Sequence, residues 1–570
     1  MSERMRLGIV LVVAVLVYGN TLLNGFTYDD EAYVLRNQAV KTFNVHGLFQ
    51  PTRNGNILRP VTFGSFAVDW MITGPRPFWY HLVNVLLNAA VSLMVFVVLR
   101  LLLEGIPRVE TIAFVSALVF AVHPIHTEAV ASVVGRSELL AAGFLLLAWL
   151  LHLKDRATAV LACLALALMS KESAAGFLPL VLAGDYARGK LKPVARYVQI
   201  AGTTALYLAL MWWAKGGRFG ATSVSFLDNP LASLPVELRV LNALRVAWRY
   251  LALQVYPATL SSDYSYNSIR LYSDWRYCLP ALAATILLLL LWGWTIWTGR
   301  KAWALTGAIY LGGFAVTANV VIPTGTIMGE RLAYLPSIGF CILVALAWLR
   351  LEKQRPDFAR VVLVMLLVAL SARTVIRNRD WRDNMALFSS AVRAVPLSAK
   401  MHCDLGEEYV NRGQLQAAAL ELQTALNIYP DYPDALETYG IVEANLGHDQ
   451  NAQKLMEEAL AKSTGSPLDR DFMAANLAAL FIKMGRDEEA LNLLNQVIQD
   501  WGGFASAWSN RAAIHAKRGE LGAARTDAET ALRLDPSSTQ AKNVLKELDK
   551  PRGEPLEPHG SLGAVRPGGS

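Results

Sequence analysis

The sequence predicts an all-helical protein in two parts, a bundle of membrane-spanning helices followed by a helical solenoid. Hydrophobic residues make up 54% of the 570-residue chain and charged residues 17%, which is too apolar for an ordinary soluble protein of this length. The long apolar segments stop near residue 380, and a helical pattern with a period of 34 residues follows them. Together these observations indicate a membrane domain and a repeat domain.

Eleven apolar segments approach the length of about 20 residues that a membrane-spanning helix needs, and we expect each to cross the bilayer. They are residues 7–24, 81–103, 111–127, 137–153, 157–172, 174–187, 197–214, 277–298, 302–322, 333–350 and 360–377. A twelfth apolar segment, around residues 240–256, carries Arg239, Arg245 and Arg249 at helical spacing. It is expected to lie in the membrane interface or to re-enter the membrane.

Lys and Arg are concentrated in short turns between these segments, at residues 154–156, 188–196, 300–301 and 350–360. The positive-inside rule places these turns in the cytoplasm, which also accounts for the net charge of +7 without a nucleic-acid partner. The first apolar segment lacks a small-residue cleavage site and is predicted to be an uncleaved helix. Eleven spans then put the N-terminus in the cytoplasm and the C-terminal part outside.

The C-terminal part repeats a pattern of small and aromatic residues. The first unit contains Gly406, Tyr409, Ala418, Leu422, Ala425 and Pro430, and the second contains Gly440, Gly447, Ala452 and Ala459. The third contains Ala478, Phe481, Gly485 and Ala490, and the fourth contains Ala512, Gly519, Ala524, Ala531 and Pro536. This pattern and its 34-residue period are typical of tetratricopeptide repeats.

We therefore predict three regions: a membrane domain over residues 1–380, four repeats with a capping helix over residues 399–548, and a disordered tail over residues 551–570. Stacked repeats of this type form a concave surface that holds extended polypeptide. The repeats are thus expected to bind a peptide or protein, although a spacer would have the same pattern.

An acidic triplet, Asp29-Asp30-Glu31, follows the first apolar segment in the predicted outer loop. Two interpretations remain open at this point. The triplet is either a solvated charge cluster, or a site in which a carboxylate near hydrocarbon has a raised pKa and acts as a base on a hydroxyl.

Further polar residues lie in later outer turns. His123, His126 and Glu128 have the chemistry of metal ligands, but Pro124 interrupts the helix face that paired histidines would share, which favours a hydrogen-bonded polar turn. The four cysteines show neither metal-binding nor disulfide spacing. No metal site is therefore predicted.

Cations in three outer turns, Arg136, Lys171 and Arg331, stand at the edges of apolar segments. Ionisable residues in such places are functional candidates, and guanidinium groups bind phosphate through two parallel hydrogen bonds. One face would then carry acids that can activate a hydroxyl and cations that can stabilise a phosphate.

At this point the sequence resembles the transmembrane and tetratricopeptide-repeat-containing O-mannosyltransferases and their bacterial relatives, within the GT-C superfamily of glycosyltransferases. The resemblance covers nearly the whole chain. It is carried, in order, by Tyr28-Asp29-Asp30 with Asn37, residues 59–62 (RPVT), 81–84 (HLVN), 123–130 (HPIHTEAV), 135–140 (GRSELL), 171–172 (KE), 330–337 (ERLAYLPS) and 377–381 (RNRDW).

The resemblance implies a GT-C-type membrane domain and inverting transfer of a sugar, mannose in eukaryotic members, from a polyprenyl-phosphate carrier to Ser or Thr hydroxyls of an acceptor protein. It implies that Asp29 or Asp30 is the general base. The candidate substrate-binding residues are Glu31, Arg59, His123, His126, Glu128, Arg136, Lys171, Glu330 and Arg331. The expected partners are the lipid-linked donor, membrane lipid and an acceptor bound by the repeats. The expected location is a bacterial inner membrane.

The resemblance fixes neither the sugar nor a requirement for a divalent cation. Two departures from the family pattern bear on this: the repeat array is shorter than in many eukaryotic members, and Glu31 extends the acidic pair to a triplet. The main alternative is a noncatalytic membrane-anchored scaffold that assembles an envelope or secretory complex. A polyprenol-linked saccharide transporter is less consistent with spans that are mostly apolar.

Overall fold

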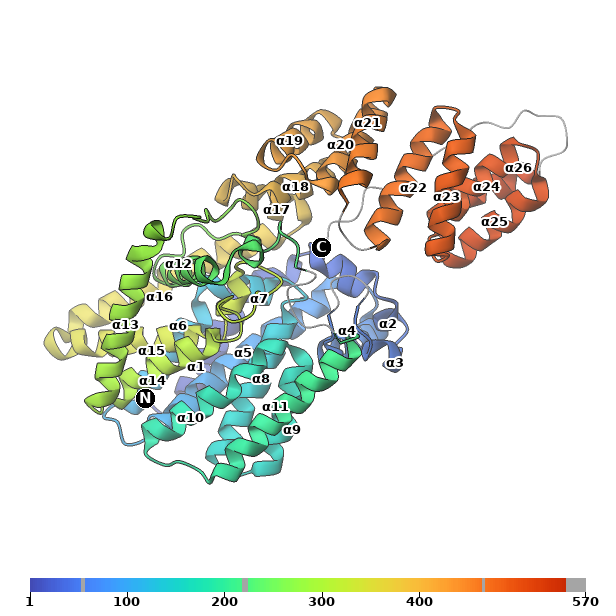
Figure 1. The fold of residues 1–570 in the computed structure, drawn as a ribbon. Helices are drawn as coiled ribbons and strands as arrows, with labels where there is room; N and C mark the ends of the chain where they lie inside the picture. Colours follow the sequence, from blue (N-terminus) through green and yellow to red (C-terminus); the bar gives the residue numbers. More distant parts are fainter. Residues whose placement is uncertain (53–56, 218–223, 464–466, 550–570) are drawn as a thin grey trace. The chain divides into compact units, whose positions relative to one another are not determined.

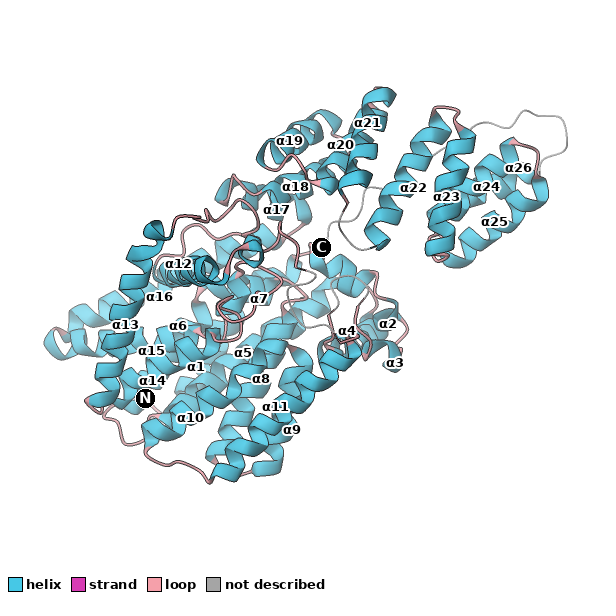
Figure 2. Cartoon of the chain, in the orientation of Figure 1, coloured by secondary structure: helices cyan, strands magenta, loops and turns pink. Residues whose placement is uncertain are grey.

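The computed structural model describes residues 1–52, 57–217, 224–463 and 467–549, and within these ranges the regular secondary structure is entirely helical (Figure 2). The predicted all-helical fold is therefore confirmed for this part of the chain. The chain divides into two compact units at Leu397 and Ser398. The predicted tail, residues 551–570, lies outside the described residues.

The first unit contains the N-terminal seventeen of the labelled helices (Figure 1). Short helices occupy the early loops: α2 (Gln38–Lys41), α3 (Val45–Leu48) and α7 (Thr127–Ala131). The longer ones are α1 (Glu3–Tyr18), α4 (Pro60–Thr73), α5 (Pro77–Leu102), α6 (Val109–Val122), α8 (Arg136–Leu153), α9 (Ala157–Ser170), α10 (Phe177–Arg188), α11 (Val194–Ala214), α12 (Val236–Val255), α13 (Leu279–Trp297), α14 (Lys301–Phe314), α15 (Ser337–Gln354), α16 (Pro356–Asn378) and α17 (Asn384–Ala394).

Helix α5 forms the centre of this unit, where it packs against α1, α6 and α8 (Figure 1). Proline at its first position starts the helix without losing a backbone hydrogen bond. Apolar side chains at helical spacing, among them Val91, Val95 and Leu99, are buried in the core of the unit. Four polar residues, His81, Asn84, Asn88 and Ser92, are buried on the same helix and need partners within the protein.

Each of the eleven predicted spans coincides with one of these helices, namely α1, α5, α6, α8 to α11 and α13 to α16. Among the residues that the structure describes, five helical segments are long and apolar enough to cross a membrane: Glu3–Leu23, Pro77–Leu102, Arg136–Leu153, Trp275–Trp297 and Pro356–Trp381. The bent pair formed by α6 and residues 124–131 would add a sixth. The first unit thus has the apolar helices of a membrane protein, while the number of eleven spans stays a prediction.

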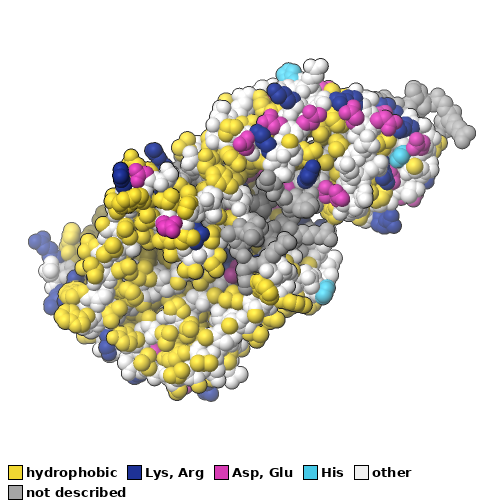
Figure 3. All heavy atoms as spheres, in the orientation of Figure 1, with side chains coloured by type: hydrophobic (Ala, Val, Ile, Leu, Met, Phe, Trp, Pro, Cys, Tyr) yellow, Lys and Arg dark blue, Asp and Glu magenta, His cyan; other side chains and the backbone are white. Residues whose placement is uncertain are grey.

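Hydrophobic side chains dominate the face of the first unit that Figure 3 shows, whereas charged side chains are frequent on the second unit. Helix α13 is the extreme case, because none of its residues is buried. Helix α12 differs from α13, since it buries several residues, including Val246, Tyr250 and Leu253, and its three arginines, Arg239, Arg245 and Arg249, are partly buried. Its predicted interfacial or re-entrant placement is not tested by this geometry.

The second unit contains four consecutive helix pairs and a final helix. The pairs are α18 (Ala399–Asn411) with α19 (Leu415–Ile428), α20 (Pro433–Asn445) with α21 (Asp449–Lys462), α22 (Pro467–Lys483) with α23 (Asp487–Asp500), and α24 (Ala505–Lys517) with α25 (Leu521–Leu534). Helix α26 (Thr539–Leu548) packs against the last pair. The limits of the three predicted regions remain our proposal.

A glycine with positive φ ends the first helix of every pair. Gly413, Gly447, Gly485 and Gly519 have φ values of 71°, 86°, 76° and 76°. This left-handed conformation is strained for residues with a side chain, and it closes the helix and turns the chain toward the second helix of the pair. The turn geometry of the solenoid is therefore encoded at one repeated position.

Inside the pairs, a second kind of glycine permits close helix packing. A Cβ atom on Gly406 would lie 2.7 Å from Cγ of Leu422, and one on Gly440 would lie 2.7 Å from Cγ of Met456. Contacts this short require the neighbouring side chain to move. The small residues recognised in the sequence thus have a steric role.

We predict that Gly406→Val destabilises the solenoid by about 1–3 kcal/mol, because the added atoms overfill the contact with Leu422. Gly522→Val is the matched control, since nothing lies within 4 Å of a Cβ at that position. Urea unfolding of a fragment spanning residues 398–549 would measure both free energies. Equal unfolding free energies for the two variants would contradict the packing role of Gly406.

Candidate functional site

The acidic triplet follows α1 and a short 3₁₀ turn, and its three side chains differ in burial and in hydrogen-bond partners. Asp30 is fully buried. Its Oδ2 accepts a hydrogen bond from the Thr27 amide at 3.0 Å, and its Oδ1 accepts one from the Val134 amide at 2.9 Å and one from the Ser132 hydroxyl at 3.4 Å. Asp30 therefore ties the first loop to the turn between α7 and α8.

Burial raises the pKa of Asp30 to about 7, against the opposing effect of the amide hydrogen bonds from Thr27 and Val134. The nearby negative charge of Asp29 raises the pKa further. The pKa of this carboxyl group thus lies near neutral pH, but both of its oxygens already accept hydrogen bonds from the protein.

Asp29 and Glu31 are only partly buried. The charge of Glu128 is the main cause of the raised pKa of Arg331, and the negative charge of Asp29 raises it further, so Asp29 lies within electrostatic range of Arg331. Glu31 instead accepts a hydrogen bond of 2.7 Å from Arg36 in an ion pair whose side chains are 32% and 52% exposed. Among the three acids, Asp29 is the one that combines access with proximity to a candidate phosphate-binding cation.

Arg331 is held by Glu128, a nearly fully buried acid on α7. The Arg331 amide donates to Oε2 of Glu128 at 2.8 Å, and its guanidinium Nη1 donates to Oε1 of the same carboxylate. The Arg331 side chain remains 31% exposed, and within the described ranges its other guanidinium N–H groups have no hydrogen-bond partner. Arg331 is thereby fixed at one edge and open at the other.

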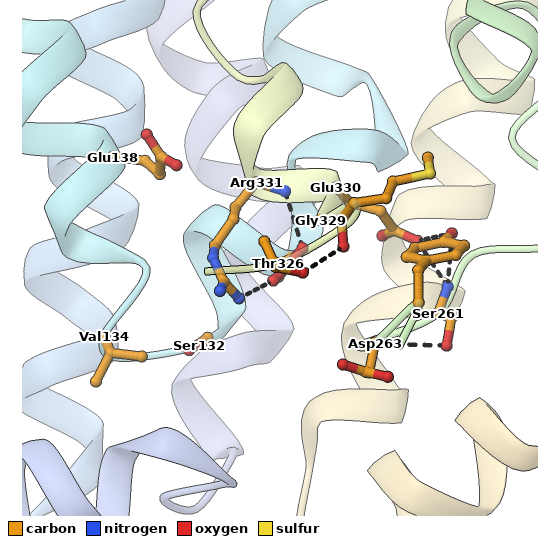
Figure 4. A network of polar contacts seen from close by, with 12 residues as sticks. Ser132, Val134, Glu138, Ser261, Asp263, Thr326, Gly329, Glu330 and Arg331 are labelled. Carbon is orange, nitrogen blue, oxygen red and sulfur yellow. Dashed lines mark hydrogen bonds and ion pairs between the residues drawn. The ribbon is translucent and has the colours of Figure 1, made fainter. Parts of the chain in front are cut away.

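Glu330, the preceding residue, points away from Arg331 (Figure 4). Its Oε1 accepts hydrogen bonds from the Ser261 amide at 2.6 Å and the Tyr264 hydroxyl at 2.8 Å, and its Oε2 lies 3.8 Å from Nη2 of Arg377. Burial raises the pKa of Glu330 to about 7, although Arg377 lowers it. Glu330 therefore anchors the loop that carries Arg331 and does not itself reach the cation cluster.

Two further ion pairs belong to the same group of charges, because Arg59 and Arg331 both act electrostatically on Lys171. Lys171 pairs with Glu138, and both side chains are less than a tenth exposed. Arg59 pairs with Glu172 through Nη2 at 2.9 Å and through Nε at 3.2 Å, with both side chains about a quarter exposed. Burial lowers the pKa of Lys171 to about 8 despite Glu138, and the positive charges of Arg59 and Arg331 lower it further. The three cations thus lie in one electrostatic cluster.

Arg136 was expected to contact an anion, but the structure surrounds it with protein groups. It is fully buried, and its guanidinium donates to Oδ1 of Asn84 at 2.9 Å, to the Tyr80 carbonyl at 3.0 Å and to the Ser65 hydroxyl at 3.3 Å. It also forms an ion pair of 2.6 Å with Asp69. This arrangement fits a structural role in joining α4, α5 and α8.

His123 and His126 are also fully buried, and their ring nitrogens are occupied. His123 accepts from the Ile125 amide at 3.2 Å and lies 2.9 Å from the Gln254 carbonyl. His126 contacts the Phe120 carbonyl at 2.9 Å and the Ser337 hydroxyl at 2.8 Å. No cluster of three potential metal ligands occurs in the part of the chain that the structure describes. Both histidines act here as hydrogen-bonding groups of the core.

The structure thus brings Asp29, Arg59, Lys171 and Arg331 together and adds partners that the sequence did not single out. Glu138 and Glu172 neutralise two of the cations. Asp69 pairs with Arg136, and Asn84 connects that arginine to the turn bound by Asp30. The sequence could have indicated Glu138 and Glu172, because each is an acid at the edge of an apolar segment and needs a partner there.

The fold and the site define a helical membrane protein that carries a paired-charge polar centre and a separate solenoid of helix pairs. Residues 476–539 match the family model described as a tetratricopeptide repeat. A protein O-mannosyl-transferase of Caenorhabditis elegans is 29% identical over 74% of this chain and 63% of its own length. The human protein O-mannosyl-transferase TMTC3 is 27% identical over 92% of this chain and 64% of its length.

These matches confirm the resemblance inferred from the motifs: the chain is similar to proteins named protein O-mannosyl-transferases, and residues 476–539 match a tetratricopeptide repeat. It spans less than two thirds of the length of these relatives. Among solved structures, YrrB, titled a tetratricopeptide-repeat protein with an unusual peptide-binding site, is 17% identical with a TM-score of 0.24 over 35% of this chain and 98% of its own. A TM-score this low does not establish a shared fold.

We predict that Asp69→Asn destabilises the protein by about 3 kcal/mol, because it leaves the buried charge of Arg136 without its counter-ion. Glu31→Gln breaks an exposed ion pair and is expected to have little effect. Thermal unfolding of the detergent-solubilised variants would test this. Similar melting temperatures for Asp69→Asn and Glu31→Gln would contradict the structural role of the buried pair.

The raised pKa of Asp30 predicts a pH-dependent stability. Because the folded pKa is about 7 and an unfolded aspartate titrates near pH 4, the unfolded state loses its proton first. Ionisation of Asp30 therefore lowers stability progressively between about pH 4 and pH 7, with no further change above that range. Asp30→Asn should flatten the dependence of melting temperature on pH across this window, and an unchanged slope would argue against the assignment.

Proposed function

We propose that this chain is a membrane glycosyltransferase that transfers a sugar, with mannose as the first candidate, from a polyprenyl-phosphate carrier to Ser or Thr hydroxyls of an acceptor protein. The proposal rests on the clustering of a partly exposed acid, Asp29, with three cations, Arg59, Lys171 and Arg331. The relationship to protein O-mannosyl-transferases supports the same activity.

In the proposed reaction, Asp29 is the general base. Its carboxylate removes the hydroxyl proton while the acceptor oxygen forms a bond to the anomeric carbon of the sugar. The bond between that carbon and the phosphate oxygen breaks on the opposite face, so the configuration inverts. Asp29 is favoured over Asp30 because it is partly accessible, whereas both oxygens of Asp30 are buried and hydrogen-bonded.

The cations would stabilise the departing polyprenyl phosphate. Arg331 has guanidinium N–H groups without a partner among the described residues and an exposed edge, so it is our first candidate for the phosphate contact. Arg59 is accessible to a similar extent. Lys171 is more deeply buried and would add charge at longer range. The acids Glu128, Glu138 and Glu172 would keep the cations in place before the donor binds.

The other residues predicted to bind substrate would act indirectly in this proposal. Asp30, Arg136, Glu330 and the two histidines hold the turns that carry the site, as their buried hydrogen bonds indicate. Glu31 would remain at the entrance, because it pairs with an exposed arginine.

We also propose the orientation inferred from the basic turns, with the N-terminus in the cytoplasm and this site and the solenoid on the outer face. The solenoid would bind the acceptor chain, and the bacterial inner membrane is the proposed location. The support is the concentration of Lys and Arg in the turns on one side of the predicted spans.

We predict that Asp29→Asn lowers sugar transfer by about 10²- to 10⁴-fold, which is the usual contribution of a general base. The assay would measure transfer from a synthetic polyprenyl-phosphate mannose to Ser/Thr peptides by the protein reconstituted in nanodiscs. Glu31→Gln is the control and should retain activity, because its side chain faces Arg36. Asp30→Asn should reduce activity together with stability.

Full activity of both Asp29→Asn and Asp30→Asn would contradict an enzymatic role of the acidic pair. The noncatalytic scaffold would then be supported if deletion of residues 399–548 abolished recovery of bound proteins. A fall in activity for Asp30→Asn but not for Asp29→Asn would transfer the role of the base to Asp30.

We further predict that Arg331→Lys raises the KM for the lipid-linked donor about tenfold or more, because lysine keeps the charge but lacks the forked N–H geometry that binds phosphate. Arg36→Lys changes an exposed arginine outside the cluster and serves as control. An unchanged KM for Arg331→Lys would place the donor phosphate elsewhere.

A further inference from the structure

A shallow, open cavity lies on the surface of the first unit, where the turn between α13 and α14 meets the loop after α5 and the end of α15. Its volume is about 500 Å³. Apolar side chains, including Ile106, Pro107 and Leu349, line part of it. The rest of the lining includes four cations, Arg300, Lys301, Arg350 and Lys353. No acidic residue contributes to this lining.

These four cations are exposed, and within the described residues none of them forms an ion pair. Other basic residues in the turns do have carboxylate partners. Arg108 pairs with Glu352 at 2.5 Å, and Lys192 in another turn pairs with Asp155 at 2.6 Å. The cavity therefore carries four uncompensated positive charges.

Aromatic rings hold two of the guanidinium groups at the cavity. The guanidinium carbon of Arg350 lies 4.8 Å from the ring centroid of Trp303, which is itself a lining residue. That of Arg300 lies 4.1 Å from the ring of Trp294. Such cation–π contacts restrict the side chains without neutralising their charge. The positive charge is thereby concentrated at a defined place rather than spread along a mobile turn.

The cavity adjoins a surface that suits lipid. Helix α13 ends one turn before Arg300, has no buried residue and exposes Leu290 and Trp297 by 66% and 84%. A helix so apolar and so exposed is expected to face acyl chains, and a tryptophan near its end suits the membrane interface. A ligand at the cavity would thus have its anionic part among the cations and its apolar part along α13.

We propose that this cavity binds the headgroup of an anionic phospholipid that carries two phosphate charges, the class represented by cardiolipin. Four cations around one cavity match a doubly charged headgroup better than a single phosphate. Basic pockets between membrane helices on the cytoplasmic side have the chemistry for such headgroups. The inference is independent of the transfer reaction, because none of its residues belongs to the proposed catalytic cluster.

The test is native mass spectrometry of the full-length protein in detergent with added cardiolipin and, separately, phosphatidylcholine. The wild-type protein should retain cardiolipin in preference to phosphatidylcholine. The variant R300Q/K301Q/R350Q/K353Q should bind it about tenfold more weakly or worse, because each basic residue near an anionic headgroup strengthens binding. The control R4Q/K154Q/R156Q/K190Q removes four exposed cations that do not line the cavity and should bind cardiolipin like the wild type.

Four results would overturn the proposal. Equal loss of cardiolipin in the control would indicate a general effect of charge, and unchanged binding in the cavity variant would exclude the site. Displacement of the lipid by millimolar inorganic phosphate would identify a free-anion site in place of a lipid site. If the fourfold variant does not fold, R300Q/K301Q, which changes only the exposed turn, should still weaken cardiolipin binding measurably, and wild-type affinity there would reject the site.

Discussion

The buried guanidinium of Arg136 is the contact on which the polar centre depends. It joins α8 to Asp69 on α4 and to Asn84 on α5. The amide of Asn84 in turn donates to the carbonyls of Val130, Ser132 and Val133, which fixes the turn before α8. That turn supplies the amide that binds Asp30. A charge at the start of one helix thus positions the first loop and the acids in it.

The cations of the site are stabilised by a consistent arrangement, in which each one has its own carboxylate. Lys171 with Glu138 combines two nearly buried side chains, and the partly exposed Arg331 pairs with the nearly fully buried Glu128; both pairs join segments far apart in the sequence. Burying charges of one sign without partners would cost desolvation free energy. Pairing with a carboxylate lowers that free-energy cost and fixes the orientation of each cation. The site can therefore hold several positive groups near one another without an anionic ligand present.

The sequence predicted the helical elements well, because apolar segments and a 34-residue repeat are local patterns. It also located the acidic triplet and the cations, since charged residues at the edges of apolar segments are conspicuous. It did not separate Asp29 from Asp30, because burial of the second depends on a turn about one hundred residues later. Nor did it show that every guanidinium nitrogen of Arg136 has a protein partner, since Asp69 and Asn84 belong to other helices.

The glycine that ends the first helix of every solenoid pair has a consequence for how such chains change in length. Because each pair closes with the same left-handed residue, every unit presents its successor with an equivalent starting geometry. A unit in a linear stack contacts only its neighbours, so a whole unit can be gained or lost with little disturbance elsewhere. Duplication or deletion of segments near 34 residues is then a low-barrier evolutionary route, by which the reach of the solenoid can be adjusted while the membrane unit stays constant.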